Sequence, residues 1–150
     1  MSVLDFLSPD AAVASAKFKP VAKSSMERHQ RDAGARFETR DGWLVPVSID
    51  GEAEHLANVG VADLSHLGKI EVRGEGAPEP GVVAWHQVKR DLAIVLTETA
   101  RCAEVRASLA SRFPIVLDQT GALSILVLSG PKAKEALSHL THLHHFPASG

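Results

Sequence analysis

Three side chains with catalytic chemistry stand within four residues, at Asp63, Ser65 and His66. A carboxylate, a hydroxyl and an imidazole are the group types of a hydrolase triad. Triad partners must converge in space, which neighbours on one extended segment rarely do, and the sequence has no Gly-x-Ser-x-Gly elbow. The pattern therefore favours a turn in which Asp63 or Ser65 caps backbone N–H groups before a strand at 68–74.

A second concentration of reactive groups lies between residues 138 and 145, which hold four of the eight histidines. His142 and His145 are three apart, a spacing that on a helix presents two imidazoles to one metal ion. No cysteine stands nearby, and no carboxylate is placed to complete the ligand set. We therefore predict a solvated helix end, where histidines favour the negative end of the helix dipole, and no metal site.

Cys102 and the glycines near residue 75 predict no further catalytic or nucleotide site. Cys102 falls at helical spacing with Val105 and Leu109, which predicts a small buried side chain rather than a nucleophile. The segment Gly74-Glu75-Gly76 lacks the third glycine and the following helix of a dinucleotide fingerprint, and there is no Walker-type loop. Nucleotide phosphate is not an expected ligand.

The composition excludes several classes of partner. The 150 residues carry 18 acidic and 16 basic side chains, a net charge of -2, so no basic face is expected to attract nucleic acid. No segment reaches the roughly 18 apolar residues of a membrane span, and the N-terminus lacks the basic start and apolar run of a signal peptide. A single cysteine permits no internal disulfide. These observations favour one domain in a reducing, cytoplasmic compartment.

The elements that must position these groups follow from periodicity and from helix and turn signals. They are an N-terminal arm or short helix at 1–23, a helix between Ser24 and Gly34, a strand at 43–49, a short helix at 52–58, a strand at 68–74, a loop at 74–81, strands at 91–97, 114–118 and 123–128, a helix at 98–112 and a helix after Pro131. Ser24 and Glu27 suit a capping box, and Pro46 restricts its strand to a sheet edge or a bulge. The strands at 91–97, 114–118 and 123–128 are predicted to be buried.

Strands and helices mix without strict alternation, which favours an α+β fold with a mostly antiparallel sheet and a few packed helices. In the 68–74 strand Ile70 and Val72 fall on one face and charged residues on the other. One face of the sheet is therefore expected to contact water. The domain is predicted to occupy residues 24–150.

Two ordered sets of residues resemble one known family. The first comprises Arg28-His29, Gly34-Ala35-Arg36-Phe37, Gly42-Trp43, Pro46-Val47, Glu54-His55-Leu56 and the run from Gly60 to Gly74, and the second extends from Asp118 through Gly130-Pro131 to Leu137. The first set resembles the opening of the glycine-cleavage T-protein (aminomethyltransferase) family, and the second resembles its Leu-x-Leu-x-Gly-Pro strand-to-helix step. The shortened layout, with its ending at Phe146-Pro147, is closest to the γ subunit of heterotetrameric sarcosine oxidase.

The resemblance implies the N-terminal folate-binding domain of that family and a role in tetrahydrofolate-linked one-carbon transfer. In such proteins folate lies in a central channel built by several domains and accepts a methylene unit from an aminomethyl group. The family's Asp-x-Ser-His-x-Gly-Lys segment lies at this channel. The implied folate-binding residues are therefore Asp63, Ser65, His66, Leu67 and Lys69.

The chain also departs from the family where catalysis is concerned. T-proteins carry an Asp-Asp-Leu-Ile-Val-like strand whose acid is central to catalysis, and no paired acid occurs here. Asp91, which precedes an apolar strand, is the candidate remnant of that catalytic acid, and a role as a capping or turn aspartate explains it equally. The chain has no tyrosine, although the family uses aromatic groups around the folate, and no segment resembles the later domains. A complete enzyme is therefore not expected from this chain by itself.

Two functions remain open at this point. The favoured one is a tetrahydrofolate-binding subunit or accessory in one-carbon transfer from an aminomethyl or methylamine donor, of the glycine cleavage or sarcosine oxidation type. It would work with a protein partner or a second copy, and the general base would come from Asp91 or from the partner. The alternative is a non-catalytic structural or interaction module that keeps the fold and has lost folate binding. A stand-alone aminomethyltransferase is least favoured.

Overall fold

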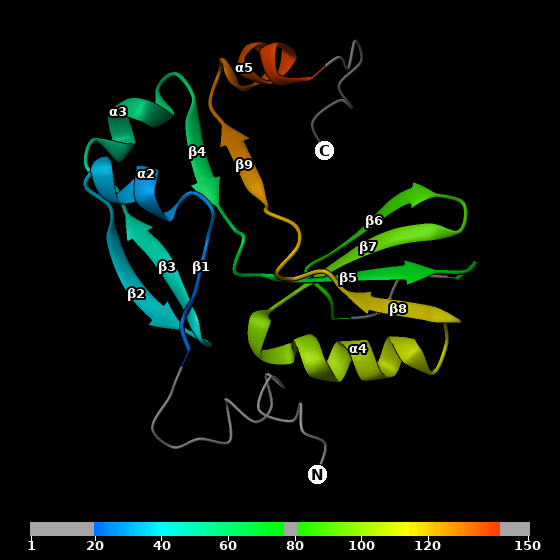
Figure 1. The fold of residues 1–150 in the computed structure, drawn as a ribbon. Coiled ribbons are helices and arrows are strands. Elements are labelled where there is room, and N and C mark those ends of the chain that lie inside the picture. The colour runs from blue at the N-terminus through cyan, green and yellow to red at the C-terminus, as the bar shows by residue number, and fades with distance from the viewer. Residues whose placement is uncertain (1–19, 77–80, 142–150) are drawn as a thin grey trace.

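The computed structural model describes residues 20–76 and 81–141, which form three sheets and several short helices (Figure 1). In chain order the elements are β1 (Ala22–Lys23), α2 (Glu27–Asp32), β2 (Arg36–Arg40), β3 (Trp43–Ser48), α3 (Glu52–Leu56), β4 (Gly60–Asp63), β5 (Gly68–Arg73), β6 (Ala84–Lys89), β7 (Leu92–Thr97), the 3-10 helix η2 (Thr99–Arg101), α4 (Cys102–Ala110), β8 (Ile115–Asp118), β9 (Leu126–Ser129) and α5 (Ala133–Leu140). The strand orders are β1-β3-β2, β4-β9 and β6-β7-β5-β8. Only β1 and β3 pair in parallel among the described strands, so the predicted α+β, mostly antiparallel fold is confirmed.

β2 and β3 form a hairpin, of which the periodicity predicts only the second strand. Asp41 and Gly42 connect the two strands with φ angles of 48° and 79°, the two left-handed positions of a type I′ turn. Arg40 and Trp43 pair directly across this turn. The Asp-Gly pair is therefore the sequence signal for β2, because this dipeptide is among the strongest short-range indicators of a two-residue hairpin.

Pro46 lies in β3 without removing a sheet hydrogen bond that the fold needs. β3 is the middle strand, but β1 pairs only with Trp43 and Leu44, so the strand is an edge at Pro46 on that side. On its other side the register with β2 shifts between Arg36 and Phe37. The prediction that Pro46 stands at an edge or a bulge is confirmed, since both features occur beside it.

The main core lies between α4 and one face of the four-stranded sheet (Figure 1). Its buried members are Ile70, Val72, Ala93, Val95, Val105, Leu109 and Phe113. The opposite face carries the ion pair between Arg73 Nε and Glu71 Oε1, at 2.7 Å, with 54% of the Arg73 side chain exposed. Lys69 on the same face is 1% exposed, so along β5 the expected contact with water holds only at the Arg73 end. β6 completes this sheet on one edge and is not predicted from the sequence.

The sequence predicts β8 and β9 as buried strands, and for burial this prediction is wrong. β8 lies at the edge of the four-stranded sheet, where Ile115 and Leu117 are 46% and 44% exposed. β9 pairs only with β4, and Leu126 and Val127 are 44% and 41% exposed. Apolar runs indicate strands, but whether another layer covers them depends on tertiary packing that the pattern does not encode.

Two predictions near the N-terminus also need correction. The capping box does not form: Ser24 Oγ accepts from the Met26 N–H, and the Glu27 carboxylate binds the Arg31 guanidinium instead. The arm predicted at 1–23 falls mostly outside the described residues. Its last two residues, however, form β1 and belong to the first sheet.

The backbone at position 130, in the strand-to-helix step after β9, favours a glycine. Its φ is +108°, and a Cβ at this position would lie 2.6 Å from the carbonyl oxygen of Asn58. The same oxygen accepts the Lys132 N–H at 3.0 Å, so the two backbone segments cannot separate without losing this hydrogen bond.

We expect Gly130→Ala to lower the free energy of unfolding by roughly 1–3 kcal/mol, because it combines a strained backbone with a backbone clash. Denaturant unfolding of the two proteins measures this difference. Gly121→Ala is the matched control, since a Cβ there meets nothing within 4 Å. Equal losses of stability in both variants would contradict the close-approach explanation.

Candidate functional site

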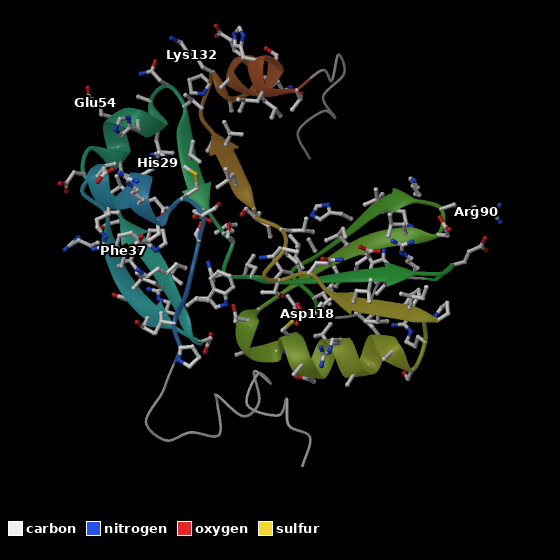
Figure 2. All side chains as sticks on the ribbon, viewed as in Figure 1. His29, Phe37, Glu54, Arg90, Asp118 and Lys132 are labelled. Carbon is white, nitrogen blue, oxygen red and sulfur yellow. The ribbon has the colours of Figure 1, made fainter. Side chains whose placement is uncertain are left out.

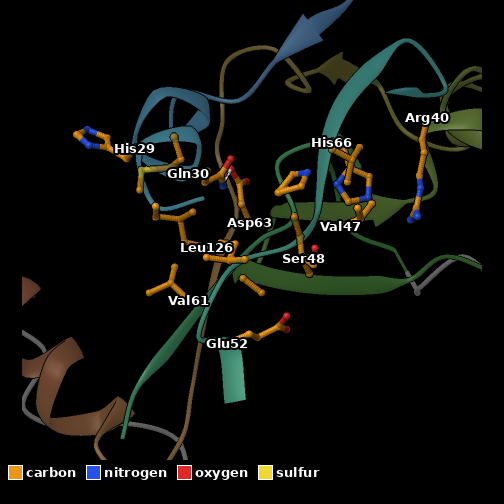
Figure 3. Close-up of a pocket in the computed structure, with 17 residues that line it drawn as sticks. His29, Gln30, Arg40, Val47, Ser48, Glu52, Val61, Asp63, His66 and Leu126 are labelled. Atoms are coloured by element: carbon orange, nitrogen blue, oxygen red, sulfur yellow. Dashed lines mark hydrogen bonds between the residues drawn. The ribbon is translucent and has the colours of Figure 1, made fainter. Parts of the chain in front are cut away.

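A cavity of about 540 Å³ lies between α2, β3, β4 and the start of β9. Its wall is largely aliphatic and includes Val45, Val47, Ile49, Val61 and Leu126. The polar side chains that line it are His29, Gln30, Arg40, Ser48, Glu52, Asp63 and His66 (Figure 3). We call this space the large cavity. An aliphatic body with a few polar groups is the usual composition of a small-molecule site.

Asp63 ends β4 and fixes the turn that follows. Its Oδ1 accepts the Ser65 N–H at 2.9 Å, as predicted, and its Oδ2 accepts from Gln30 Nε2 at 2.8 Å. Burial opposes ionisation of the carboxyl, but hydrogen bonds from Ser24, Ser65 and Gln30 outweigh it and hold the pKa below its ordinary value. Asp63 is therefore ionised, accepts a hydrogen bond at each carboxylate oxygen, and connects α2 to the turn.

Ser65 and Lys69 are buried supports of the same turn. Ser65 is 3% exposed, and its Oγ accepts the Ile125 N–H from the segment before β9. Lys69 is 1% exposed, and its Nζ donates to the carbonyl oxygens of Ser65 and Leu67 at 2.6 and 2.9 Å. Burial lowers the pKa of the Lys69 ammonium, although Asp118 and Asp63 oppose the shift. These contacts stabilise the turn and leave little of either side chain open to a ligand.

His66 is the member of the predicted folate set that combines a half-buried side chain with a place on the large cavity. Burial lowers the pKa of its imidazole, and the charges of Arg40 and Lys69 lower it further against the opposing effect of Asp63. The neutral ring can then both donate and accept a hydrogen bond at pH 7. Leu67 is half-buried and contributes its carbonyl oxygen to Lys69 rather than its side chain to this cavity.

A second, smaller cavity of about 320 Å³ borders Lys69, at the end of the turn. Lys69, His86, Ile94, Leu96 and the segment 123–126 line it. Leu126 belongs to the walls of both cavities. The turn from Asp63 to Lys69 therefore borders two spaces, with His66 on the large one and Lys69 on the small one.

Curated relatives and a solved structure resemble this chain. The aminomethyltransferase of Mycobacterium leprae is 28% identical over 155 residues, covering 79% of this chain and 42% of the relative. That of Mycobacterium avium is 52% identical over 56 residues, covering 35% of this chain and 15% of the relative. The glycine cleavage system aminomethyltransferase T of Bartonella henselae shares the fold with a TM-score of 0.58 and 18% identity, covering 79% of this chain and 43% of that structure. In sequence and in fold, the chain therefore resembles aminomethyltransferases of the T-protein superfamily.

This T-protein-like chain spans about two fifths of the length of the first curated relatives that it matches. No family model matches it. The predicted resemblance to the T-protein superfamily is thus confirmed, and the shared fold supports the expected type of domain. In the part of the chain that the structure describes, no helix has the length and apolar character to cross a membrane.

Asp91, the candidate catalytic acid, is not brought to the turn that the T-protein resemblance singles out. Its carbonyl oxygen accepts the Gly74 N–H, at the end of β5 opposite to Gly68. Five residues of strand separate Gly68 from Arg73, about 17 Å at the usual rise. Asp91 is exposed and follows Arg90, which Figure 2 shows at the outer tip of the β6–β7 hairpin. Asp91 is not among the residues that line either cavity.

Part of the histidine cluster of this T-protein-like domain lies beyond the residues that the structure describes. His142 and His145 lie outside the described residues, and across 20–76 and 81–141 no three His, Cys, Asp or Glu side chains are grouped as metal ligands. Cys102 is half-buried, with its Sγ 3.8 Å from Thr120 Oγ1. Burial raises the pKa of this thiol, which lowers its thiolate fraction at neutral pH.

Gln30 is the site residue that sequence reasoning missed. It lies in α2, is 8% exposed and leaves its Oε1 without a hydrogen-bond partner among the described residues. A buried unpaired amide oxygen costs roughly 1–3 kcal/mol. A glutamine in a short polar helix carries no sequence signal of burial, because only its tertiary contact with Asp63 distinguishes it from its neighbours.

Proposed function

We propose that this domain binds a tetrahydrofolate in the large cavity and serves as a subunit or accessory in one-carbon transfer from an aminomethyl or methylamine donor. The observation that carries the proposal is the position of His66, which places a neutral imidazole on a mainly aliphatic cavity beside Gln30. A folate needs polar partners for its pterin edge and an apolar wall for its body, and the residues present fit both needs. The relatives' name, aminomethyltransferase, supports this class of reaction.

The roles of individual residues follow from their contacts. His66 would hydrogen-bond the ligand, while Asp63, Ser65 and Lys69 would hold the turn that presents it, and the backbone of Leu67 would complete that frame. Tetrahydrofolate supplies the amine that accepts the one-carbon unit. Asp63 is ionised but hydrogen-bonded on both oxygens, so we assign the general base to a partner chain rather than to Asp63 or Asp91. A partner of the sarcosine oxidase or glycine cleavage type, in the cytoplasm, would suit such a domain.

We expect His66→Ala to weaken binding of 5-formyltetrahydrofolate roughly tenfold or more, which corresponds to loss of about 1.4 kcal/mol of binding free energy. Isothermal titration calorimetry of the purified chain gives the affinity. His86→Ala is the matched control, because His86 lines the small cavity instead. Loss of affinity only in the His86 variant would indicate that the ligand binds in the small cavity. Unchanged affinity in the His66 variant would contradict the assignment of His66 as a folate contact.

The absence of saturable heat at millimolar ligand would contradict the folate proposal itself. The domain would then be a structural module that keeps the fold. Exposed aliphatic side chains on β8 and β9, including Leu117 and Val127, offer such a module a contact surface. Co-purification with a partner that protects these side chains from solvent would support that second function.

A further inference from the structure

Three consecutive carbonyl oxygens at the centre of the turn accept hydrogen bonds from side chains. Lys69 Nζ donates to the oxygens of Ser65 and Leu67, at 2.6 and 2.9 Å. Thr99 Oγ1 donates to the oxygen between them, that of His66. The two carbonyl groups bound by one ammonium therefore flank His66, whose imidazole lies on the large cavity. The position of this imidazole depends on where the Lys69 ammonium is held.

Trp43 contacts this ammonium from another sheet. Lys69 Nζ lies 5.7 Å from the centre of the Trp43 ring, within range of a cation–π interaction. Lys69 is 1% exposed and Trp43 is half-buried, and such attraction is stronger where the cation is removed from water. Trp43 begins β3 in the sheet of β1, β2 and β3, whereas Lys69 belongs to β5 in the four-stranded sheet. Figure 1 shows these two sheets on opposite sides of the segment that joins β4 to β5.

The strand that carries Trp43 also supplies part of the wall of the large cavity, through Val45, Val47 and Ile49. We propose that Trp43 is a positioning residue for His66: its ring fixes the Lys69 ammonium, which fixes the backbone on both sides of the imidazole. One strand then sets both the aliphatic wall and the place of the polar group. A group that meets a ligand must be held rigidly by the residues behind it. The identity of that ligand rests on the proposed function.

The groups that face His66 make its titration a measure of its position. Burial lowers the pKa of the imidazole, and the charges of Arg40 and Lys69 lower it further. The charges of Asp63 and Asp41 oppose this shift. If the Lys69 ammonium is released, its charge moves away from the imidazole and water reaches the ring. Both changes raise the pKa of His66 toward its ordinary value of 6.5.

An NMR titration of the assigned His66 imidazole tests the proposal without any ligand. We expect its pKa to rise by roughly 0.5 units or more in Trp43→Leu, and by less in Trp43→Phe, which keeps a weaker aromatic face. Trp85→Leu is the matched control, because Trp85 packs against Phe113 in the main core. It should lower stability and leave the His66 titration unchanged. An unchanged pKa in Trp43→Leu, or an equal shift in the control, would overturn the proposal. If the leucine variant does not fold, the absence of a shift in Trp43→Phe has the same meaning.

Calorimetry with 5-formyltetrahydrofolate then asks whether Trp43 acts through His66. Trp43→Leu is expected to weaken binding roughly threefold or more in the wild-type chain and to add nothing in a chain that already carries His66→Ala. Equal losses in both backgrounds would show that Trp43 acts by another route, and would overturn the proposal. If no variant binds folate, the proposed function fails, and the titration of His66 still decides the role of Trp43.

Discussion

Replacing Lys69 with methionine is expected to lower the free energy of unfolding by roughly 2–4 kcal/mol. Lys69 is 1% exposed. Its ammonium group donates hydrogen bonds to the carbonyl oxygens of Ser65 and Leu67. It also lies 5.7 Å from the centre of the Trp43 ring, within range of a cation–π interaction. Methionine is also unbranched and is one atom shorter, and it leaves both carbonyl oxygens without this donor.

Denaturant unfolding of Lys69→Met against the wild type measures the effect, with an unchanged m-value as the sign that both unfold in the same way. Lys89→Met is the matched control, because Lys89 is an exposed residue of β6 and should change stability by no more than about 0.5 kcal/mol. If the two variants lose similar amounts, Lys69 does not hold the turn and its hydrogen bonds contribute little.

Lys69 also shows that the residues of one sequence motif can differ in structural role. The resemblance to T-proteins singled out Asp63, Ser65, His66, Leu67 and Lys69 together as folate-binding residues. The structure places Asp63, Ser65 and Lys69 inside the turn, bonded to backbone groups, and leaves the imidazole of His66 on the large cavity. A shared motif records every residue that a local shape requires, so it does not separate those that build the shape from those that meet a ligand.

The elements that periodicity predicts best are those with one buried face. α4 buries Val105 and Leu109 at helical spacing, and β5 buries Ile70 and Val72 at strand spacing. β2 is missed because it is largely exposed and polar, as its pattern of one half-buried residue among exposed ones shows. Its only strong signal is the Asp41–Gly42 turn, which fixes the hairpin through backbone conformation rather than through hydrophobic pattern.

Distances between segments could not be read from the sequence at all. Asp91 and Lys69 are both near apolar strands, yet the antiparallel pairing of β5 with β7 places them at opposite ends of the sheet. Tertiary contact likewise brings Gln30 and Asp63 together from 33 positions apart. A candidate site assembled from neighbouring residues is therefore more predictable than one completed by a distant element.

Replacing Asp63 with asparagine is expected to lower the free energy of unfolding at pH 7 by roughly 2–3 kcal/mol, because hydrogen bonds to an ionised group contribute more than neutral ones. The Asp63 carboxylate accepts hydrogen bonds from two donors, Gln30 Nε2 and the Ser65 N–H. An asparagine side chain has only one acceptor oxygen for these two donors. The amide hydrogens of the new side chain would face one of these donors. α2 and the turn before β5 would both lose their connection.

The dependence of this loss on pH separates the charge of Asp63 from its shape. The pKa of Asp63 in the folded chain lies below its ordinary value of 3.8, so the carboxylate contributes stability that is present above pH 3.8 and is lost as the pH falls through the lowered pKa. The difference in unfolding free energy between the wild type and Asp63→Asn should therefore be constant near neutral pH and shrink below pH 3.8. Urea unfolding at a series of pH values measures it. A difference that stays the same down to about pH 2 would show that packing, not the charged hydrogen bonds, makes Asp63 important.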